Sequence, residues 1–291
     1  MTRRLEPGES LELACSVAAE AGRMLVARAD EARVVEVKSS PTDIVTQLDR
    51  AAEGLIRERI LARRPDDAIL GEEGGETGGG APVRWIVDPL DGTVNFLYGL
   101  PDWAVSVAAE VEGSVVAGAI CAPARGAMYW AIAGAGARRG GLTGPGGASE
   151  SLACTRGADL SRALVATGFG YEEERRRVQG EVLAAILPRV RDIRRSGSCA
   201  IDLCALAAGN VDAYYERGVN QWDFAAGSLI AREAGATVAG LCGRPAGPSM
   251  LLAAGPGLFA GLHDLLAGLD PERDEPGPAR GSDGLNLSDL A

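Results

Sequence analysis

The sequence predicts a layered fold that joins an α+β half to an α/β half. Two amphipathic helical segments stand near the start of the 291 residues, at 9–30 and 46–64. Residues 83–137 then form short apolar runs separated by turn residues, as antiparallel strands do. In the second half of the chain, strand-like and helix-like segments alternate, which is typical of crossover connections in α/β structures.

The N-terminal half, residues 1–150, begins with the helix at 9–30, whose apolar residues recur at helical spacing. A short strand is expected at 33–40. The helix at 46–64 has Thr46 as a candidate N-cap and ends before Pro65. We expect these two helices to cover one face of a sheet.

The C-terminal half, residues 151–269, follows a glycine-rich loop and should contain alternating strands and helices. Residues 74–82 are predicted to be a mobile loop and residues 270–291 a disordered tail, because both are polar and rich in Gly or Pro. The C-terminal strands are expected at 163–169, 190–196, 211–216, 236–239 and 250–254, and the helices near 178–187, 198–208, 222–234 and 257–268.

The charge balance argues against a nucleic acid or an anionic membrane as the main partner, because the net charge is −11. No apolar signal core or stretch of about 18 apolar residues is evident, so we expect a cytoplasmic protein with no membrane partner. The six cysteines are scattered, without metal-ligand spacing, and are expected to be reduced and mostly buried.

Histidine chemistry is improbable because His263 is the only histidine and lies in an apolar run near the end. Triads, phosphohistidine intermediates and histidine-rich zinc sites all need imidazoles. Hydrolytic chemistry must therefore rest on carboxylates, hydroxyls and a hard metal. Of the 29 basic residues only Lys38 is a lysine. It is either needed as a compact positive charge or retained by chance.

The segment WIVDPLDGTVNF, residues 85–96, is the strongest signal of chemistry. Asp88 and Asp91 stand at the end of an apolar strand, where both carboxylates can converge on hard cations. Thr93 and Asn95 follow at an expected helix start, whose free N–H groups suit a phosphate. Asp-Pro and Asp-Gly are also ordinary turn pairs, but the complete string is far more specific.

This string resembles the second signature of the inositol monophosphatase family, the lithium-sensitive, Mg²⁺-dependent phosphatases. Three other segments agree with the family in order: ILGEEGG at 69–75, KSSPTDIVTQLD at 38–49 and QWDFAAGSLIAREAGA at 221–236. The resemblance extends over residues 9–268. It implies a layered αβαβα sandwich of the lithium-sensitive sugar phosphatase type, and a homodimer.

The resemblance also implies two to three Mg²⁺ ions per site. The first would be held by Glu72, Asp88 and the Leu90 carbonyl, the second by Asp88, Asp91 and Asp223, and a third, weaker ion by Glu72. Two metals about 3.5–4 Å apart can activate a water and neutralise the leaving alkoxide. Four clustered carboxylates without metal would repel one another and raise each other's pKa values.

Catalysis, by the same resemblance, would use Thr93 with Asp49 behind it to orient and deprotonate the attacking water, with Glu72 as a further catalytic group. The backbone N–H groups of Gly92 and Thr93 would hold the phosphate. Substrate contacts would come from these residues, from Asp91 and Asp223, and from two further matching segments. These are RRSGSCAIDL at 194–203 and DAYYERG at 212–218, which contribute Gly197, Ser198, Cys199 and Glu216. Glu216 can accept hydrogen bonds from vicinal hydroxyls, which favours inositol monophosphate.

Plainer interpretations stay open for several of these residues. Asp49 could be a solvated helix residue, Glu73 a surface charge, Asp223 the acidic residue at a helix start and Ser198 a cap. Related enzymes act on histidinol phosphate, fructose 1,6-bisphosphate, nucleotide 3′-phosphates or NADP, and some relatives associate with transcription machinery. The short loops suggest no basic pocket for a second phosphate.

Overall fold

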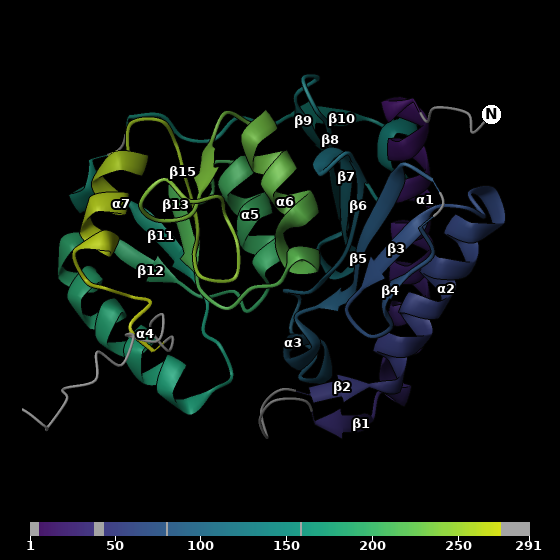
Figure 1. Cartoon of the computed structure of the whole chain (residues 1–291), viewed down its shortest axis with the longest axis horizontal. Helices are drawn as coiled ribbons and strands as arrows, with labels where there is room; N and C mark the ends of the chain where they lie inside the picture. Colours follow the sequence, from purple (N-terminus) through teal and green to yellow (C-terminus); the bar gives the residue numbers. More distant parts are fainter. Residues whose placement is uncertain (1–5, 38–43, 80, 158, 275–291) are drawn as a thin grey trace, which may run out of the picture.

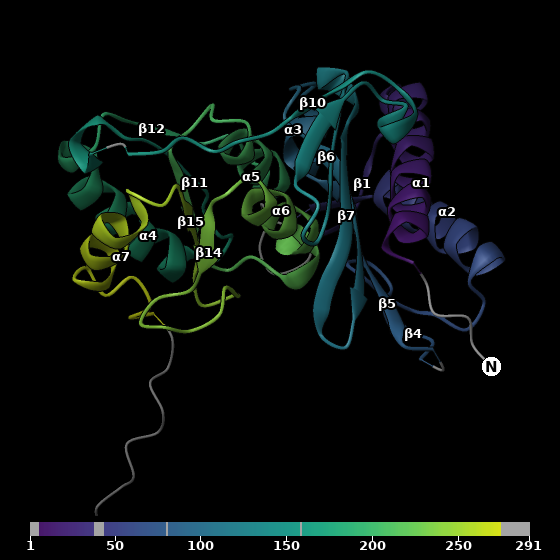
Figure 2. The same ribbon diagram turned by 90° about the horizontal axis from the view of Figure 1, so that it is seen from above.

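The fold is a sandwich of five layers, in the order helices, sheet, helices, sheet, helices (Figures 1 and 2). The computed structural model describes residues 6–37, 44–79, 81–157 and 159–274. Lys38 lies outside these residues. The predicted αβαβα arrangement is confirmed.

The first layer consists of α1 (Pro7–Ala27) and α2 (Gln47–Arg63), which pack on one face of the larger sheet. Thr46 caps α2, since its hydroxyl accepts from the N–H groups of Leu48 and Asp49 at 3.1 and 3.4 Å. Both predicted helices and their shared sheet face are therefore confirmed.

The larger sheet has eight strands in the order β10-β9-β8-β7-β6-β5-β3-β4. All neighbours are antiparallel except β3 and β5. Its strands are β3 (Ala68–Gly71), β4 (Gly75–Thr77), β5 (Val83–Asp91), β6 (Ala104–Val111), β7 (Ser114–Ala122), β8 (Ala127–Ile132), β9 (Ala137–Gly140) and β10 (Ser149–Ser151). A separate hairpin pairs β1 (Val34–Val37) with β2 (Ile44–Thr46).

The central layer consists of α5 (Cys199–Ala207) and α6 (Gln221–Glu233), which lie between the two sheets (Figure 2). Ala200 and Ile230 belong to the apolar cluster against the larger sheet, whereas Leu203 and Ala231 belong to the cluster against the smaller one. Each helix is apolar on two opposite faces, because each of these faces packs against a sheet.

The smaller sheet has the order β12-β11-β13-β15-β14, and α4 (Glu173–Ile186) and α7 (Phe259–Ala267) cover its outer face. Its strands are β11 (Leu164–Thr167), β12 (Asp192–Arg194), β13 (Ala213–Glu216), β14 (Thr237–Ala239) and β15 (Leu251–Ala254). β11 is parallel to β12 and β13, while β15 is antiparallel to β13 and β14.

Two segments differ from expectation. The predicted loop at 74–82 contains a strand, β4, because Arg57 of α2 donates to the Gly75 carbonyl and the Thr77 hydroxyl, each at 2.6 Å. The predicted tail, 270–291, falls mostly outside the described residues, but Asp274 is packed against the domain.

The cysteines agree with the prediction, since all six are unpaired and only Cys242 is exposed. Across the described part of the chain, no helix combines the length and apolar character needed to cross a membrane.

Candidate active site

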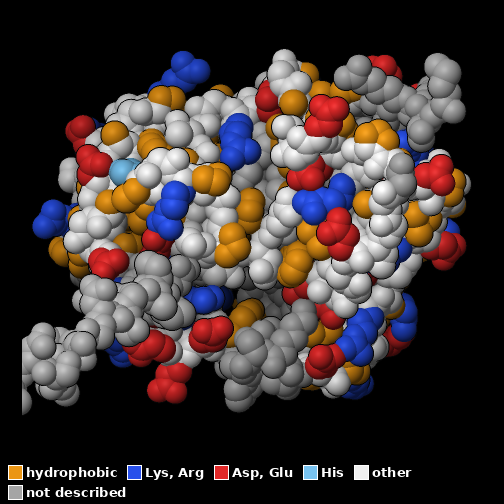
Figure 3. Space-filling view, in the orientation of Figure 1, with side chains coloured by type: hydrophobic (Ala, Val, Ile, Leu, Met, Phe, Trp, Pro, Cys, Tyr) orange, Lys and Arg blue, Asp and Glu red, His pale blue; other side chains and the backbone are white. Residues whose placement is uncertain are grey.

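The candidate site is a cleft of about 440 Å³ between the larger sheet and the C-terminal half. Figure 3 shows a hollow between the two halves of the molecule, with acidic and basic side chains interspersed around it. The cleft is lined by most of the residues proposed from the sequence, namely Glu72, Asp88, Leu90, Asp91, Gly92, Thr93, Gly197, Ser198, Cys199, Glu216 and Asp223. The sequence motifs therefore meet in one place.

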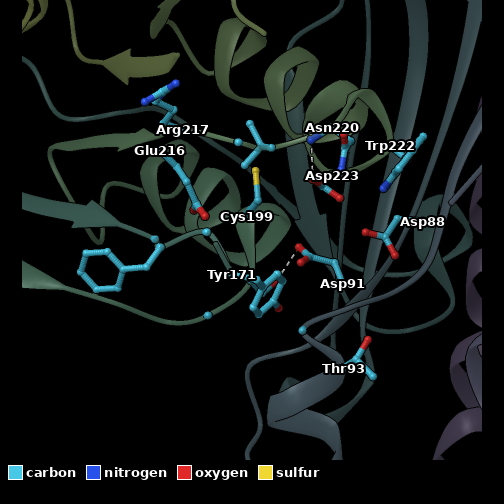
Figure 4. A pocket seen from close by; sticks show the side chains of 18 of the residues that line it. Asp88, Asp91, Thr93, Tyr171, Cys199, Glu216, Arg217, Asn220, Trp222 and Asp223 are labelled. Carbon is cyan, nitrogen blue, oxygen red and sulfur yellow. Dashed lines mark hydrogen bonds between the residues drawn. The ribbon is translucent and has the colours of Figure 1, made fainter. Parts of the chain in front are cut away.

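A β-bulge at the end of β5 puts two carboxylates on the same side of the sheet. Asp88 is opposite Ser106 of β6 and Asp91 is opposite Ala104, so β5 has one extra residue in this interval. In a regular strand, residues three apart point to opposite faces. The bulge changes that alternation, and Figure 4 shows Asp88 and Asp91 both facing the cleft. Pro89 is tolerated here because a bulge relaxes the ladder of hydrogen bonds.

Asp91 is fixed by the start of α5. Its Oδ2 accepts from the Ser198 hydroxyl at 2.7 Å and from the Ala200 N–H at 2.6 Å. The Ser198 hydroxyl also accepts from the Ile201 N–H at 3.1 Å, so Ser198 is the helix cap that the plainer interpretation anticipated. Burial raises the pKa of Asp91 to about 6, against the lowering effect of these hydrogen bonds.

Gly92 turns the chain from β5 into α3 (Thr93–Leu97). Its φ is +96°, and a Cβ at this position would lie 2.8 Å from the Asp102 carbonyl oxygen. Only glycine fits this turn without strain. The turn brings Thr93 to the mouth of the cleft, two residues after Asp91.

Thr93 and Asp49 form a pair at 2.9 Å between hydroxyl and carboxylate Oδ1. The Leu90 carbonyl lies 3.0 Å from the same hydroxyl and is a second acceptor for it. Asp49 is 2% exposed, and its other oxygen accepts from the Thr46 N–H at 3.0 Å. Asp49 is thus not a solvated helix residue; burial raises its pKa, although hydrogen bonds from Thr46 and Thr93 oppose the shift.

The turn after β3 carries Glu72 and is held by α2. Glu53, 3% exposed, accepts from the Glu73 N–H at 2.7 Å and from the Gly74 N–H at 2.9 Å. Arg57 donates to the Glu53 carboxylate at 2.7 Å. The Glu73 side chain is 7% exposed and lies 3.9 Å from Arg50, so it is not simply a surface charge.

Replacing Glu53 by glutamine is expected to weaken Mg²⁺ binding about 10-fold or more, the usual effect of losing a group that orients a metal ligand. Glutamine would turn an N–H₂ toward at least one of the three donors, which loosens the turn that carries Glu72. Calorimetric Mg²⁺ titration and the Mg²⁺ dependence of the rate measure the effect. Glu58→Gln, an exposed change on the same helix, is the matched control; equal Mg²⁺ affinity in the two variants would contradict the expectation.

Asp223 lies in the first turn of α6, where its Oδ2 accepts from the Asn220 N–H at 2.6 Å. It therefore stabilises the helix start and also lines the cleft. Burial, followed by repulsion from Glu72 and Asp91, raises the pKa of Asp223 well above its usual range. Burial and repulsion from Glu72, Asp91 and Asp223 do the same to the pKa of Asp88.

These carboxylates fit a hard divalent cation by their chemistry. They offer oxygen ligands only, and their mutual repulsion is what bound positive charge would relieve. Within residues 6–37, 44–79, 81–157 and 159–274, however, no three acidic, cysteine or histidine side chains are already arranged to hold a metal ion. The ligand set Glu72, Asp88, Leu90, Asp91 and Asp223 stays a prediction.

The other end of the cleft carries Glu216, at the end of β13. Its Oε2 accepts from the Tyr214 hydroxyl at 2.6 Å. Burial raises the pKa of Glu216 to about 7, with the Tyr214 hydrogen bond opposing the shift. A Cβ on Gly168 would lie 1.9 Å from the Glu216 carboxylate, so this glycine makes room for it.

The segment that precedes α5 is tied to α3 across the cleft. Asn95 donates to the Asp102 carbonyl at 2.6 Å and to the Ser196 carbonyl at 2.9 Å. Gly197 has φ +93°, and a Cβ there would lie 2.9 Å from the Asn95 amide nitrogen. Asn95 thus places Gly197, Ser198 and Cys199 opposite the end of β5.

Sequence reasoning missed several residues at the site. Gly168 and Tyr214 surround Glu216, and three arginines line the cleft although no basic pocket was expected: Arg175, Arg195 and Arg217. Tyr214, Arg195 and Arg217 stand inside or beside motifs that the sequence analysis used. In a chain with 28 arginines, no pattern marked these three.

Comparison with known proteins finds relatives that align with almost the whole chain. The sequence matches the inositol monophosphatase family over residues 6–269. The inositol-1-monophosphatase SuhB of Mycobacterium tuberculosis is 46% identical over 280 residues, which cover 91% of this chain and 94% of that protein. The solved structure of Mycobacterium tuberculosis SuhB has a TM-score of 0.78 at 43% identity, covering 92% of this chain and 100% of that one.

Two further relatives bear on function. The Nus factor SuhB of Pasteurella multocida is 38% identical over 78% of this chain and 84% of its own length. SaIMPase-II, solved with inositol monophosphate bound, has a TM-score of 0.71 at 27% identity and covers 90% of this chain and 98% of that one.

Proposed function

Because the chain belongs to the inositol monophosphatase family, we propose that it hydrolyses inositol monophosphate to inositol and phosphate with Mg²⁺. The observation that carries the proposal is the cleft itself, where Asp88, Asp91 and Asp223 gather opposite Glu216. The first group suits metal and phosphate, and the second suits an alcohol with several hydroxyls.

Different residues of the cleft have different roles in the proposed reaction. The groups that would hold Mg²⁺ are Glu72, Asp88, Asp91, Asp223 and the Leu90 carbonyl, and the bound metal would supply charge compensation for the transferring phosphoryl group. Thr93, oriented by Asp49 at 2.9 Å, accepts a hydrogen bond from the attacking water and passes a proton toward the Asp49 carboxylate. No covalent phosphoenzyme is required.

Specificity for the polyol comes from the opposite wall. Glu216 accepts hydrogen bonds from vicinal hydroxyls, while backbone groups near Gly197 and Ser198 meet others. Cys199 fills the space between these groups, since it is buried and lines the cleft. A substrate without hydroxyls would lose these contacts but keep the phosphate contacts.

Steady-state rates over a panel of phosphomonoesters with Mg²⁺ test the proposal. We expect the largest kcat/KM for an inositol monophosphate, and lower values for histidinol phosphate, fructose 1,6-bisphosphate, a nucleotide 3′-phosphate and NADP. A higher kcat/KM for any of the latter would assign the chain to that specificity, which the shared fold does not distinguish.

Lithium is expected to inhibit at millimolar concentrations. A monovalent ion can occupy the weaker metal position without supplying the charge that the reaction needs. The rate at saturating substrate should fall with LiCl and not with equal NaCl, which controls for ionic strength. Insensitivity to LiCl would favour the bisphosphatase or histidinol phosphatase alternatives.

The resemblance further implies a cytoplasmic homodimer without a direct nucleic-acid partner, and light scattering of the purified chain tests the stoichiometry. The relative named as a Nus factor suggests a second, transcription-associated role as the alternative. A pull-down from cell extract with and without RNase separates RNA-mediated from direct protein contacts.

A further inference from the structure

The last described residues, 271–274, contact three separate parts of the C-terminal half. We call them the C-terminal strap (Figure 1, beside α4). The Pro271 carbonyl accepts from Arg217 at 2.9 Å, Glu272 pairs with Arg244, and Arg273 pairs with Glu181 of α4. The strap lies beyond residue 269, where the match to the family ends.

Asp274 makes the most buried of these contacts. It forms an ion pair with Arg217, and the two side chains are 5% and 2% exposed. Its other carboxylate oxygen lies 3.5 Å from Nε of Arg175. Breaking a buried ion pair by removing one partner is strongly destabilising, so Asp274 helps to hold Arg217 in place.

Arg217 connects the strap to the substrate end of the cleft, since it directly follows Glu216 and lines the cleft with it. Arg175 lies against the same wall, because a Cβ on Gly218 would be 2.6 Å from its guanidinium. A small cavity behind the wall is lined by Glu216, Arg217 and Pro271. The strap therefore backs the segment that presents Glu216.

We propose that Asp274 is a positioning residue for the alcohol half of the substrate. It holds Arg217 and Arg175 from behind, and this fixes the segment 216–219 at the orientation in which Glu216 meets the substrate hydroxyls. The metal end of the cleft does not depend on it. The assignment of hydroxyl recognition to Glu216 rests on the proposed function; the mechanical role of the strap does not.

The first test compares two substrates in one preparation of Asp274→Asn: inositol 1-phosphate, and p-nitrophenyl phosphate, which has no alcohol hydroxyls. The ratio of their kcat/KM values is independent of the folded fraction. We expect it to fall roughly 10- to 100-fold through loss of orientation, mainly in KM for the inositol ester. Glu272→Gln, the same change two residues away, should keep the wild-type ratio. An unchanged ratio in Asp274→Asn would overturn the proposal.

Hydrogen exchange tests the mechanical role without any substrate. The Gly218 N–H donates to the Pro248 carbonyl at 2.7 Å, so its exchange reports on this wall. Exchange over 216–219 should be faster in Asp274→Asn than in Glu272→Gln, and equal exchange would refute the strap's role. If the wild-type protein shows no preference for the inositol ester, the proposed function is wrong. The hydrogen-exchange comparison still tests whether the strap holds segment 216–219.

A double variant covers the case in which Asp274→Asn does not fold. Arg217→Gln together with Asp274→Asn removes both buried charges, which is far less destabilising than removing one. This variant should fold and retain a wild-type Mg²⁺ response in thermal melts, yet show the lowered substrate ratio. A wild-type ratio in the folded double variant would be evidence against the proposal.

Discussion

Asp88→Asn is expected to lower kcat on the order of a thousandfold, because the metal proposed for this site would supply several kcal/mol of transition-state charge stabilisation. Asp88 is the ligand proposed to be shared by both metals. An amide keeps the shape but neutralises the charge that holds them. The fold should survive, since the Leu90 N–H that donates to Asp88 Oδ1 at 2.9 Å can donate equally to an asparagine oxygen.

The measurement is kcat at saturating Mg²⁺, with far-UV circular dichroism as the check on folding. Asp264→Asn on α7 is the matched control, because that side chain is 82% exposed and far from the motif residues in sequence. A folded Asp88→Asn protein with near-normal kcat would remove Asp88 from the catalytic machinery.

The metal-free chain is expected to lose stability as the pH rises from about 5 to about 8. Burial raises the pKa of Asp91 to about 6 and that of Glu216 to about 7, and burial with repulsion raises the pKa values of Asp88 and Asp223 further above their usual range. Each group binds its proton more tightly in the folded state. Its stabilising contribution is therefore complete below the unfolded pKa, near 4, and disappears as the pH rises through the folded pKa.

Mg²⁺ should reverse this trend because it binds the deprotonated carboxylates. At 100 times its Kd, a ligand stabilises the native state by about 2.7 kcal/mol per site. We expect the rise in Tm on adding Mg²⁺ to be larger at pH 8 than at pH 5, and phosphate to add to it only with Mg²⁺ present. Melts at fixed ionic strength measure this.

The Asp88→Asn variant serves as the reference in the same melts. Relative to wild type, its metal-free form should lose less stability between the two pH values, and its response to Mg²⁺ should be smaller. A wild-type Tm that ignores Mg²⁺ up to tens of millimolar, or phosphate stabilisation without metal, would contradict the convergent carboxylate site.

The sequence predicted the elements with strong periodicity and missed those set by contacts from elsewhere. Helix α4 was expected near 178–187 but begins at Glu173. Its first turn is entirely charged and its buried side chains start only at Val178, so the apolar pattern did not reveal that first turn. β4 carries no strand signal of its own. It pairs with β3 because Arg57, 18 to 20 residues earlier in the chain, holds its backbone and side chain.

The site residues also fall into those that the sequence identified and those that depend on distant contacts. Contiguous strings such as 85–96 identified Asp88, Asp91 and Thr93, because their spacing has chemical meaning on its own. Arg175 and Asp274 could not be found, since each acquires its role only from a partner far along the chain. Asp223 shows that the plain and the functional interpretation can hold together, as one carboxylate stabilises a helix start and faces the cleft.

The bulge in β5 also makes the pairing of this segment with β6 a determinant of activity, separately from its composition. If the same residues were paired as a regular strand without the bulge, Asp91 would turn to the opposite face from Asp88, into the apolar layer beneath α1 and α2. Every ligand type would still be present in the sequence, yet a buried, unpaired carboxylate would replace a cleft residue. Substitutions here change one group at a time, whereas loss of the bulge changes the alternation of the whole strand end, a property that no individual residue carries.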